Sequence, residues 1–236
     1  MRRLTMVIMV LGGCASASVD GGNNPGGDSG TTDDAAVDDS TQTVIDGAPD
    51  AVPIDAAPMP ITVTQSTSQV IGTPSTVNCN NGNVTGENHY YRVFPLADHG
   101  ITGPLQVQNV QFGVETSLGG HTVTVNVGTY GGAYTPGAAG LDPAQFAPIA
   151  STSLAIPNGN VFMTTAPIAL TIPAGGKMMV EIVSPATNDW FFPGSNAGAE
   201  TYPSFWRSPQ CDNTIKSYAA SGHPNVHLVM SVTGLH

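Results

Sequence analysis

Acid–base or metal chemistry in this chain would depend on a few histidine and glutamate side chains. The sequence holds six histidines, at positions 89, 99, 121, 223, 227 and 236. Among them His223 and His227 are close in sequence, but Pro224 places His223 in the loop before a strand. Because zinc needs three or four converging ligands, this pair predicts no metal site and no cofactor. We expect most of these histidines in loops or at strand edges.

Glu115 and Glu181 are the carboxylates that a glycosidase pair would require. Each is out of phase with its apolar neighbours, so each is expected on the side of its sheet that faces away from them. We therefore interpret both as solvated or paired carboxylates. A serine hydrolase is not indicated either, because the chain has no Gly-x-Ser-x-Gly sequence and residues 194–198 lack its spacing.

Binding through aromatic rings is the chemistry that the sequence favours most. Residues 190–206 hold six of the fifteen aromatic residues, both tryptophans included. Flat rings stack on sugar faces and polar neighbours bind hydroxyl groups, so the segment predicts a carbohydrate or polymer platform. The predicted ligand-binding residues are Trp190, Phe192, Tyr202, Trp206 and Arg207. The alternative is that these rings fill the core, since aromatic side chains bury large apolar areas.

The elements that must position these residues are short runs in which apolar and polar residues alternate, separated by Gly, Pro and Asn. This is a strand pattern, and its clearest example is 121–127, where valines alternate with Thr and Asn. Further strands are predicted at 61–66, 90–96, 105–115, 149–156, 162–172, 177–184 and 226–232. A parity shift between Val107 and Val110 predicts a β-bulge near Gln108 and Asn109.

No segment of ten or more residues shows a helical period, so the predicted fold class is all-β. The number of strands favours a two-sheet antiparallel β-sandwich that is jelly-roll-like, with a closed barrel as the alternative. This domain is predicted to span 60–236.

The N-terminus predicts export. Arg2 and Arg3 precede an apolar run of eight residues, Leu4–Leu11, which is a signal-peptide layout and too short for a membrane helix of about 20 residues. The stretch Leu11-Gly12-Gly13-Cys14 resembles the bacterial lipobox. That resemblance implies a lipoprotein with a signal peptide at 1–13, cleaved before Cys14, and a lipid on the Cys14 sulfur. An ordinary secretory peptide cut after Ala15 or Ala17 is the alternative.

Residues 14–59 are predicted to be the lipidated cysteine and a disordered linker. From 15 to 58 the chain has nine Asp among Gly, Ser, Thr, Ala and Pro, with no Lys, Arg, Glu or aromatic residue. Such a spacer extends over about 35–40 Å as a flexible coil. Ala15, directly after the lipidated position, favours the outer membrane over the inner one, because some bacteria retain lipoproteins in the inner membrane through an aspartate there.

The charge of the chain and its cysteine content indicate which partners are not expected and which cellular compartment it occupies. The formal charge is −11 for the whole chain and would be −13 without Arg2 and Arg3, with no clustered basic residues, so nucleic acid is not an expected partner. If Cys14 carries lipid, Cys79 and Cys211 remain for one disulfide in an oxidising compartment. That bond would stabilise the fold by up to about 5 kcal/mol. Two separate buried thiols are the alternative.

Several stretches of the domain, 89–94, 99–101, 110–115, 191–196, 209–211 and 227–230, are similar to a β-sandwich module of exported bacterial proteins. This module is often attached to secreted hydrolases, and the resemblance, over 61–234, implies fold and location rather than activity. We expect a lipid-anchored, non-catalytic accessory or adhesion domain at the cell surface that binds polysaccharide or another surface polymer. The alternatives are an envelope-assembly protein that contacts other proteins, and a hydrolase with an unrecognised site.

Overall fold

The computed structural model describes residues 57–73, 76–81 and 84–236, which belong to one compact unit, Ile54–His236. The signal peptide, the lipidated Cys14 and nearly all of the linker lie outside these residues and stay predictions. None of the described residues forms a helix with the length and apolarity that a membrane span requires.

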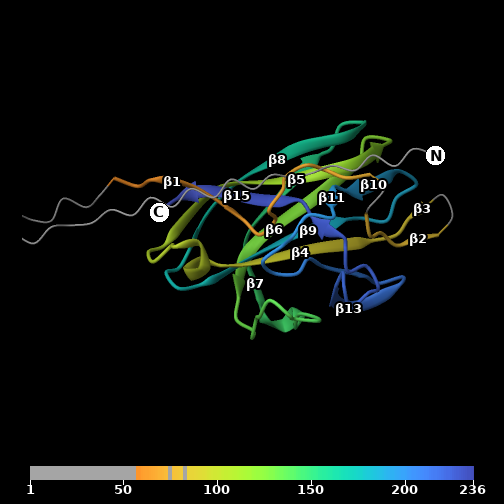
Figure 1. The fold of residues 1–236 in the computed structure, drawn as a ribbon. Helices are drawn as coiled ribbons and strands as arrows, with labels where there is room; N and C mark the ends of the chain where they lie inside the picture. Colours follow the sequence, from red (N-terminus) through yellow and green to blue (C-terminus); the bar gives the residue numbers. More distant parts are fainter. Residues whose placement is uncertain (1–56, 74–75, 82–83) are drawn as a thin grey trace, which may run out of the picture. The chain divides into compact units, whose positions relative to one another are not determined.

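Two antiparallel sheets pack against each other (Figure 1). The five-stranded sheet has the order β1 (Pro60–Thr64), β15 (Met230–Leu235), β5 (Leu105–Leu118) and β10 (Trp190–Pro193), and β8 (Gly159–Ile172) also pairs with β5. The six-stranded sheet has the order β13 (Asp212–Ser217), β12 (Phe205–Ser208), β4 (Asn88–Pro95), β9 (Lys177–Ser184), β6 (Thr122–Tyr130) and β7 (Phe146–Ala155).

Smaller elements connect these strands. They are the strand pairs β2 (Asn80–Asn81) with β3 (Val84–Thr85) and β11 (Ser195–Asn196) with β14 (His227–Leu228), and the 3-10 turns η1 (Leu96–His99) and η2 (Pro143–Gln145).

The strand pairing is nested. β6 pairs with β7, β5 with β8, and β4 with β9, and successive pairs lie in alternate sheets. A long hairpin that rolls up on itself produces this order, which is the jelly-roll arrangement. The predicted all-β, two-sheet antiparallel sandwich is therefore confirmed. The predicted β-bulge is confirmed as well, because the register of β5 against β8 shifts between Val107 and Asn109.

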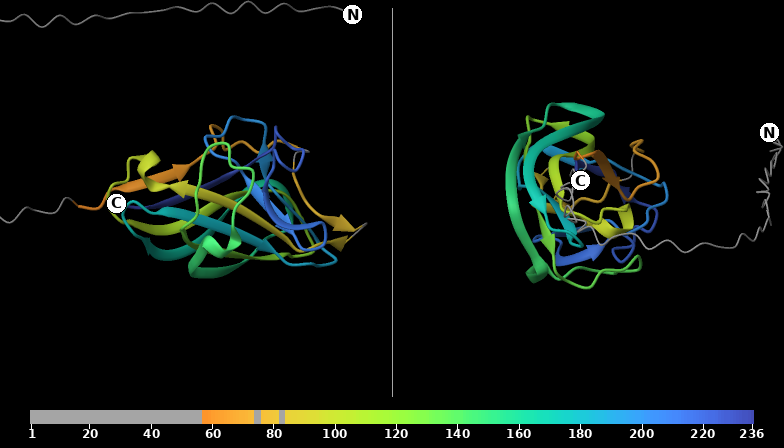
Figure 2. Two further views of the ribbon diagram at one scale, coloured as in Figure 1. Left: turned by 90° about the horizontal axis from the view of Figure 1, so that it is seen from below. Right: turned by 90° about the vertical axis from the view of Figure 1, so that its left-hand side faces the viewer.

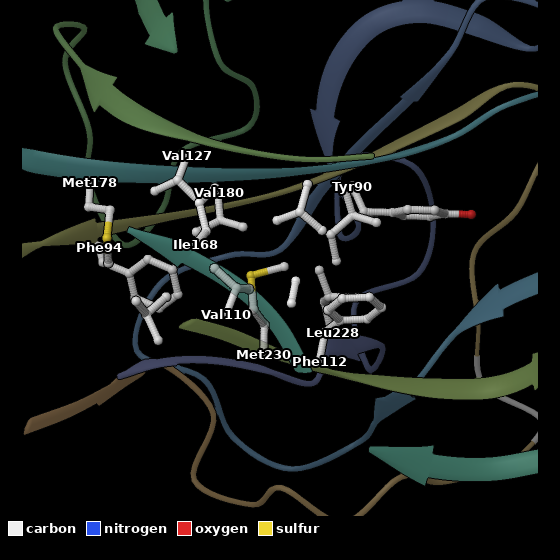
Figure 3. Packing of buried hydrophobic residues seen from close by; sticks show 14 of the residues in the cluster. Tyr90, Phe94, Val110, Phe112, Val127, Ile168, Met178, Val180, Leu228 and Met230 are labelled. Atoms are coloured by element: carbon white, nitrogen blue, oxygen red, sulfur yellow. The ribbon is translucent and has the colours of Figure 1, made fainter. Parts of the chain in front are cut away.

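The main core fills the space between the sheets. The three valines of β6, Val123, Val125 and Val127, are fully buried, as the alternation predicted. Figure 3 shows Val127 on one side of this core and Phe112 and Met230 on the other. Burying a side chain of this size contributes about 1.5–3 kcal/mol.

A second, smaller core lies on the outer face of the six-stranded sheet. Tyr90 points into the main core, so its neighbour Tyr91 points outward. The members of this second core are Tyr91, Val93, Tyr130, Leu141, Met179, Phe205 and Ile215. Tyr134 and Leu141 belong to the β6–β7 connection, so that connection folds back over this part of the face.

The strands β1, β7 and β8 each pair with a single neighbour, so they are edge strands. Each contains a proline, at Pro60, Pro148 and Pro167 respectively. Proline has no N–H to offer a further strand and is a common residue at such edges.

The disulfide between Cys79 and Cys211 is confirmed, with 6.0 Å between the Cα atoms. It joins the segment before β2 to the turn between β12 and β13. In Figures 1 and 2, β2 and β3 lie at one end of the sandwich, and β1 lies with the C-terminus at the other. At that second end, Met59 and His236 exchange two backbone hydrogen bonds.

Candidate functional site

The aromatic segment 190–206 is not one loop, because it contains β10, β11 and the start of β12. Trp190 and Phe192 are half-buried on β10 and meet edge to face, with 5.3 Å between ring centroids. Phe191 between them is fully buried in the main core, so the other two rings point to the outer face of the five-stranded sheet.

Trp206 belongs to the other sheet. It packs against the main core, and its Nε1–H donates to Ser221 Oγ at 2.8 Å. Tyr202 is half-buried, stacks on Tyr134 with 4.8 Å between ring centroids, and donates its hydroxyl hydrogen to Asp98. The structure therefore brings Trp190 and Phe192 together but separates them from Trp206, which lies on the inner side of the opposite sheet.

Arg207, the fifth predicted residue, points to the outer face of the six-stranded sheet, because Trp206 beside it points inward. Its partner in the strand register is His89 of β4. In the same register Tyr91 pairs with Glu181 of β9, and Glu181 pairs with Asn126 of β6. Side chains of directly paired residues lie on the same face.

These pairings define a mostly polar surface that crosses five strands, from β12 to β7, and that Val183 of β9 interrupts between His89 and Thr124. We call it the polar face, and its residues are His89, Tyr91, Thr124, Asn126, Ser151, Ser153, Glu181 and Arg207. Ser151 and Ser153 are exposed, whereas Thr124, Asn126 and Arg207 are half-buried. The polar face adjoins the second core on the same side of the sheet.

His89 is the central residue of the polar face. Its Nδ1 lies 2.8 Å from Glu181 Oε1, and its Nε2 lies 2.7 Å from Glu87 Oε1. Ionised carboxylates only accept hydrogen bonds, so a ring nitrogen of His89 that carries hydrogen donates to the carboxylate beside it. His89 lies within a buried strand rather than in a loop or at a strand edge, the location expected for most of the histidines.

Glu181 is held as an acceptor by its neighbours. Asn126 Nδ2–H donates to its Oε2 at 2.7 Å. Burial alone would raise the pKa of Glu181, but hydrogen bonds from His89, Asn126 and Tyr91 outweigh it and lower the pKa. Burial and the charge of Glu181 raise the pKa of Tyr91, while Arg207 acts in the opposite direction. At neutral pH the polar face therefore offers an ionised acceptor beside a protonated hydroxyl.

The two glutamates that a glycosidase pair would need are not together. Glu115 lies on β5 of the five-stranded sheet, and Glu181 lies on the outer face of the six-stranded sheet, with the main core between. A general acid at neutral pH needs a raised pKa, which Glu181 does not have. Within 57–73, 76–81 and 84–236, no three His, Cys, Asp or Glu side chains are arranged to hold a metal ion.

A second polar cluster surrounds Arg92, which is fully buried. Its Nη1 lies 2.8 Å from Glu200 Oε2, and its Nη2 donates to Ser66 Oγ at 3.0 Å. His227 Nδ1 lies 2.8 Å from the other oxygen of Glu200. Burial lowers the pKa of Arg92, and the charge of Glu200 opposes this. The contacts of Arg92 join β4 to neighbouring loops. The guanidinium is shielded from solvent, so a ligand cannot reach it.

A pocket of about 430 Å³ lies beside the disulfide. Its lining residues are Cys79, Asn80, Thr85, Gly86, Ala186, Gln210 and Cys211. The last register pair of β4 and β9 is Asn88 with Ser184, so Gly86 and Ala186 lie two residues beyond the ends of these strands. The pocket therefore lies just beyond the end of β4 at which His89 is located.

Sequence reasoning missed the polar face because its residues come from separate strands. His89 and Glu181 are 92 positions apart, and no local motif links them. The one available signal was that Glu181 lies between Val180 and Ile182, which places it on an outward face without showing which residues it meets.

Comparison with known proteins assigns this chain to no family. No protein-family model matches the chain, and no curated protein matches it. The chain is similar to a solved structure of the cysteine protease and lectin-like domains of Cwp84, a surface layer associated protein of Clostridium difficile. The TM-score is 0.42 at 11% identity, over 64% of this chain and 32% of that one. The chain thus spans about a third of the length of that protein, and the likeness carries no information about ligands.

Proposed function

We propose that this protein is a lipid-anchored, non-catalytic cell-surface domain that binds a polysaccharide across its polar face. The observation that carries the proposal is the alignment of hydrogen-bonding side chains from five neighbouring strands on one side of the six-stranded sheet. Neighbouring strands lie about 4.8 Å apart. The accessible donors and acceptors lie on the neighbouring strands β6 and β7 and, beyond the buried polar residues of β4 and β9, on β12.

The groups on the polar face suit a hydroxyl-rich ligand. Hydroxyl and amide groups of Ser151, Ser153, Thr124 and Asn126 are at least partly exposed, and Arg207 adds a planar donor. Each sugar hydroxyl can both donate and accept, so it can pair with any of these groups. A chain of sugars laid across the strands would contact them in succession.

The buried part of the polar face is preorganised. Glu181 accepts hydrogen bonds from His89, Asn126 and Tyr91, so its position is fixed before any ligand arrives. Fixing side chains in advance reduces the entropy that binding must overcome. The polar face thus has rigid residues at its centre and accessible residues around them.

Anchoring is supported by the sequence of the N-terminus. The lipobox-like Leu11-Gly12-Gly13-Cys14 would place a lipid on Cys14, and the acidic linker would separate the domain from the membrane. Replacing Cys14 by Ser should release the protein from the membrane fraction of a bacterial host. Continued membrane association of Cys14→Ser would argue against lipidation.

A glycan array with the purified protein tests the binding proposal. We expect binding to neutral polysaccharides, and Asn126→Ala or Arg207→Ala should weaken it about tenfold each, the effect of one lost hydrogen bond. Asn160→Ala is the matched control, because Asn160 is exposed on β8 of the other sheet. Loss of binding in Trp190→Ala with full binding in Arg207→Ala would instead place the ligand on the β10 surface.

The alternative of an envelope-assembly protein has one observation in its favour. Trp190 pairs in register with Leu118, which is 46% exposed, on the outer face of the five-stranded sheet. Exposed apolar side chains of this kind are typical of contacts with other proteins. Crosslinking in intact cells through position 118 tests it, since an adhesion domain that binds only glycan would give no protein adduct.

A further inference from the structure

The pocket beside the disulfide has the size of a binding site. Its volume of about 430 Å³ falls within the range of about 300–1,000 Å³ that is common for small-molecule sites. Cys79 and Cys211 form part of its wall, and Gly86 faces them. A Cβ at Gly86 would lie 3.0 Å from the Cys79 carbonyl oxygen and 3.3 Å from Gln210 Oε1. Glycine at position 86 therefore leaves room that any larger residue would reduce.

The pocket wall is fixed by hydrogen bonds as well as by the disulfide. The Cys79 N–H donates to Asn88 Oδ1 at 2.8 Å. The Asn88 side chain also donates through Nδ2 to the Gly86 carbonyl oxygen at 2.9 Å. The Gly86 N–H donates to the Cys79 carbonyl at 2.9 Å. The walls thus keep their shape without a ligand, as in most preformed sites.

The chemistry of the lining selects a neutral, polar ligand. None of the lining residues carries a charge. Asn80 and Gln210 bring side-chain amides, and the Thr85 hydroxyl is buried without a hydrogen-bond partner among the described residues. Asn80 and Gln210 are exposed, so their side-chain amides are the groups that a ligand hydroxyl can reach and pair with.

The pocket continues from the polar face. Glu87 lies between Gly86 of the pocket and Asn88 of β4, and its Oε1 is 2.7 Å from His89 Nε2. The Ser208 hydroxyl contacts both the Glu87 carbonyl oxygen and Gln210 Oε1. One set of hydrogen bonds thus joins the His89 end of the polar face to the pocket wall.

We infer that this pocket takes the terminal, uncharged sugar unit of the polysaccharide whose following units lie on the polar face. The inference rests on the proposed function and adds to it that the protein recognises a chain end. A polymer bound in this way occupies one protein per recognised end, whatever its length. A polymer bound by the polar face alone would occupy more protein molecules as it becomes longer.

The test uses the purified full chain and isothermal titration calorimetry. The probes are neutral cello-, xylo-, manno- and chito-oligosaccharides of increasing length, each intact and with its reducing end converted to the alditol. We expect one protein per oligosaccharide at every length, and Gln210→Ala should weaken binding about tenfold, the effect of one hydrogen bond. Gln106→Ala is the matched control, because Gln106 is exposed on β5 of the other sheet.

The outcomes separate the two proposals. If Arg207→Ala weakens binding but Gln210→Ala does not, or if the number of bound proteins rises with length, the end-recognition inference is overturned and the proposed function stands. If none of the neutral probes binds, both are overturned. A non-reducing gel and a thermal melt of Gln210→Ala show whether the disulfide and the fold are intact, and Asn80→Ala is the second variant if they are not.

Discussion

Replacing His89 by Ala removes the side chain that joins two carboxylates on the polar face. The bond to Glu181 is buried and charge-assisted, a type that contributes about 1.5–3 kcal/mol. The contact with Glu87, whose side chain is 41% exposed, adds about 0–1 kcal/mol. We therefore expect His89→Ala to lower the free energy of unfolding by about 1.5–4 kcal/mol, which corresponds to about 3–16 °C in Tm.

The pH dependence of this effect provides a second measurement. The folded pKa of Glu181 is lowered from its usual 4.5. Its contribution to stability is therefore complete above that value and is lost as the pH falls through the folded pKa. The part of the difference between the wild type and His89→Ala that comes from Glu181 should be complete above about pH 5 and shrink towards about pH 3.

Urea unfolding followed by tryptophan fluorescence, with the disulfide intact, measures both effects. His223→Ala is the control, because His223 is an exposed loop histidine, and it should change the free energy by less than about 0.5 kcal/mol. A cost for His89→Ala as small as the control, or one that stays constant between about pH 5.5 and 3, would refute the role given to the His89 contacts.

Three further changes test other parts of the structure. Cys79→Ser should lower the free energy of unfolding by up to about 5 kcal/mol, because the disulfide is lost. Urea unfolding measures this, and the wild type with its disulfide reduced should lose the same amount. Gly113→Ala would place a Cβ 3.0 Å from the Gly194 Cα and from the Ile71 side chain, so it should lower the free energy of unfolding by about 1–3 kcal/mol. Gly103→Ala has open space around its Cβ and should lower the melting temperature less in a thermal melt of both variants. Arg92→Met should cost about 3–5 kcal/mol by removing one partner of the buried pair with Glu200, and a near-neutral chemical denaturation curve would contradict that.

The strands could be predicted because each depends on a local pattern. Valines at every second position of 121–127 place one face of β6 in the core, whatever strand lies beside it. The bulge near Gln108 was equally local, since one extra residue inverts the parity of everything that follows.

The site could not be predicted in the same way. The polar face depends on which strands are neighbours and in what register, and a jelly roll pairs strands that are far apart in the sequence. The same topology explains why Trp190 and Trp206 separate, although they are only 16 positions apart. The chain passes from the five-stranded sheet at β10 to the six-stranded sheet at β12, so these two residues lie in opposite layers. Proximity in the sequence was therefore a poor guide to proximity in space.

The placement of β1 beside the C-terminus determines which end of the domain a tether before β1 would hold. Met59, just before β1, pairs with His236, whereas β2 and β3 lie at the other end of the sandwich (Figure 2). Asn80 of β2 and Thr85 of β3 line the disulfide pocket. A tether attached before β1 would hold the domain by one tip and leave the other tip free to sweep through the surrounding space. A fluorescent protein fused after His236 would sit at the held tip, so single-molecule tracking on living cells could follow the domain without obstructing its ligand.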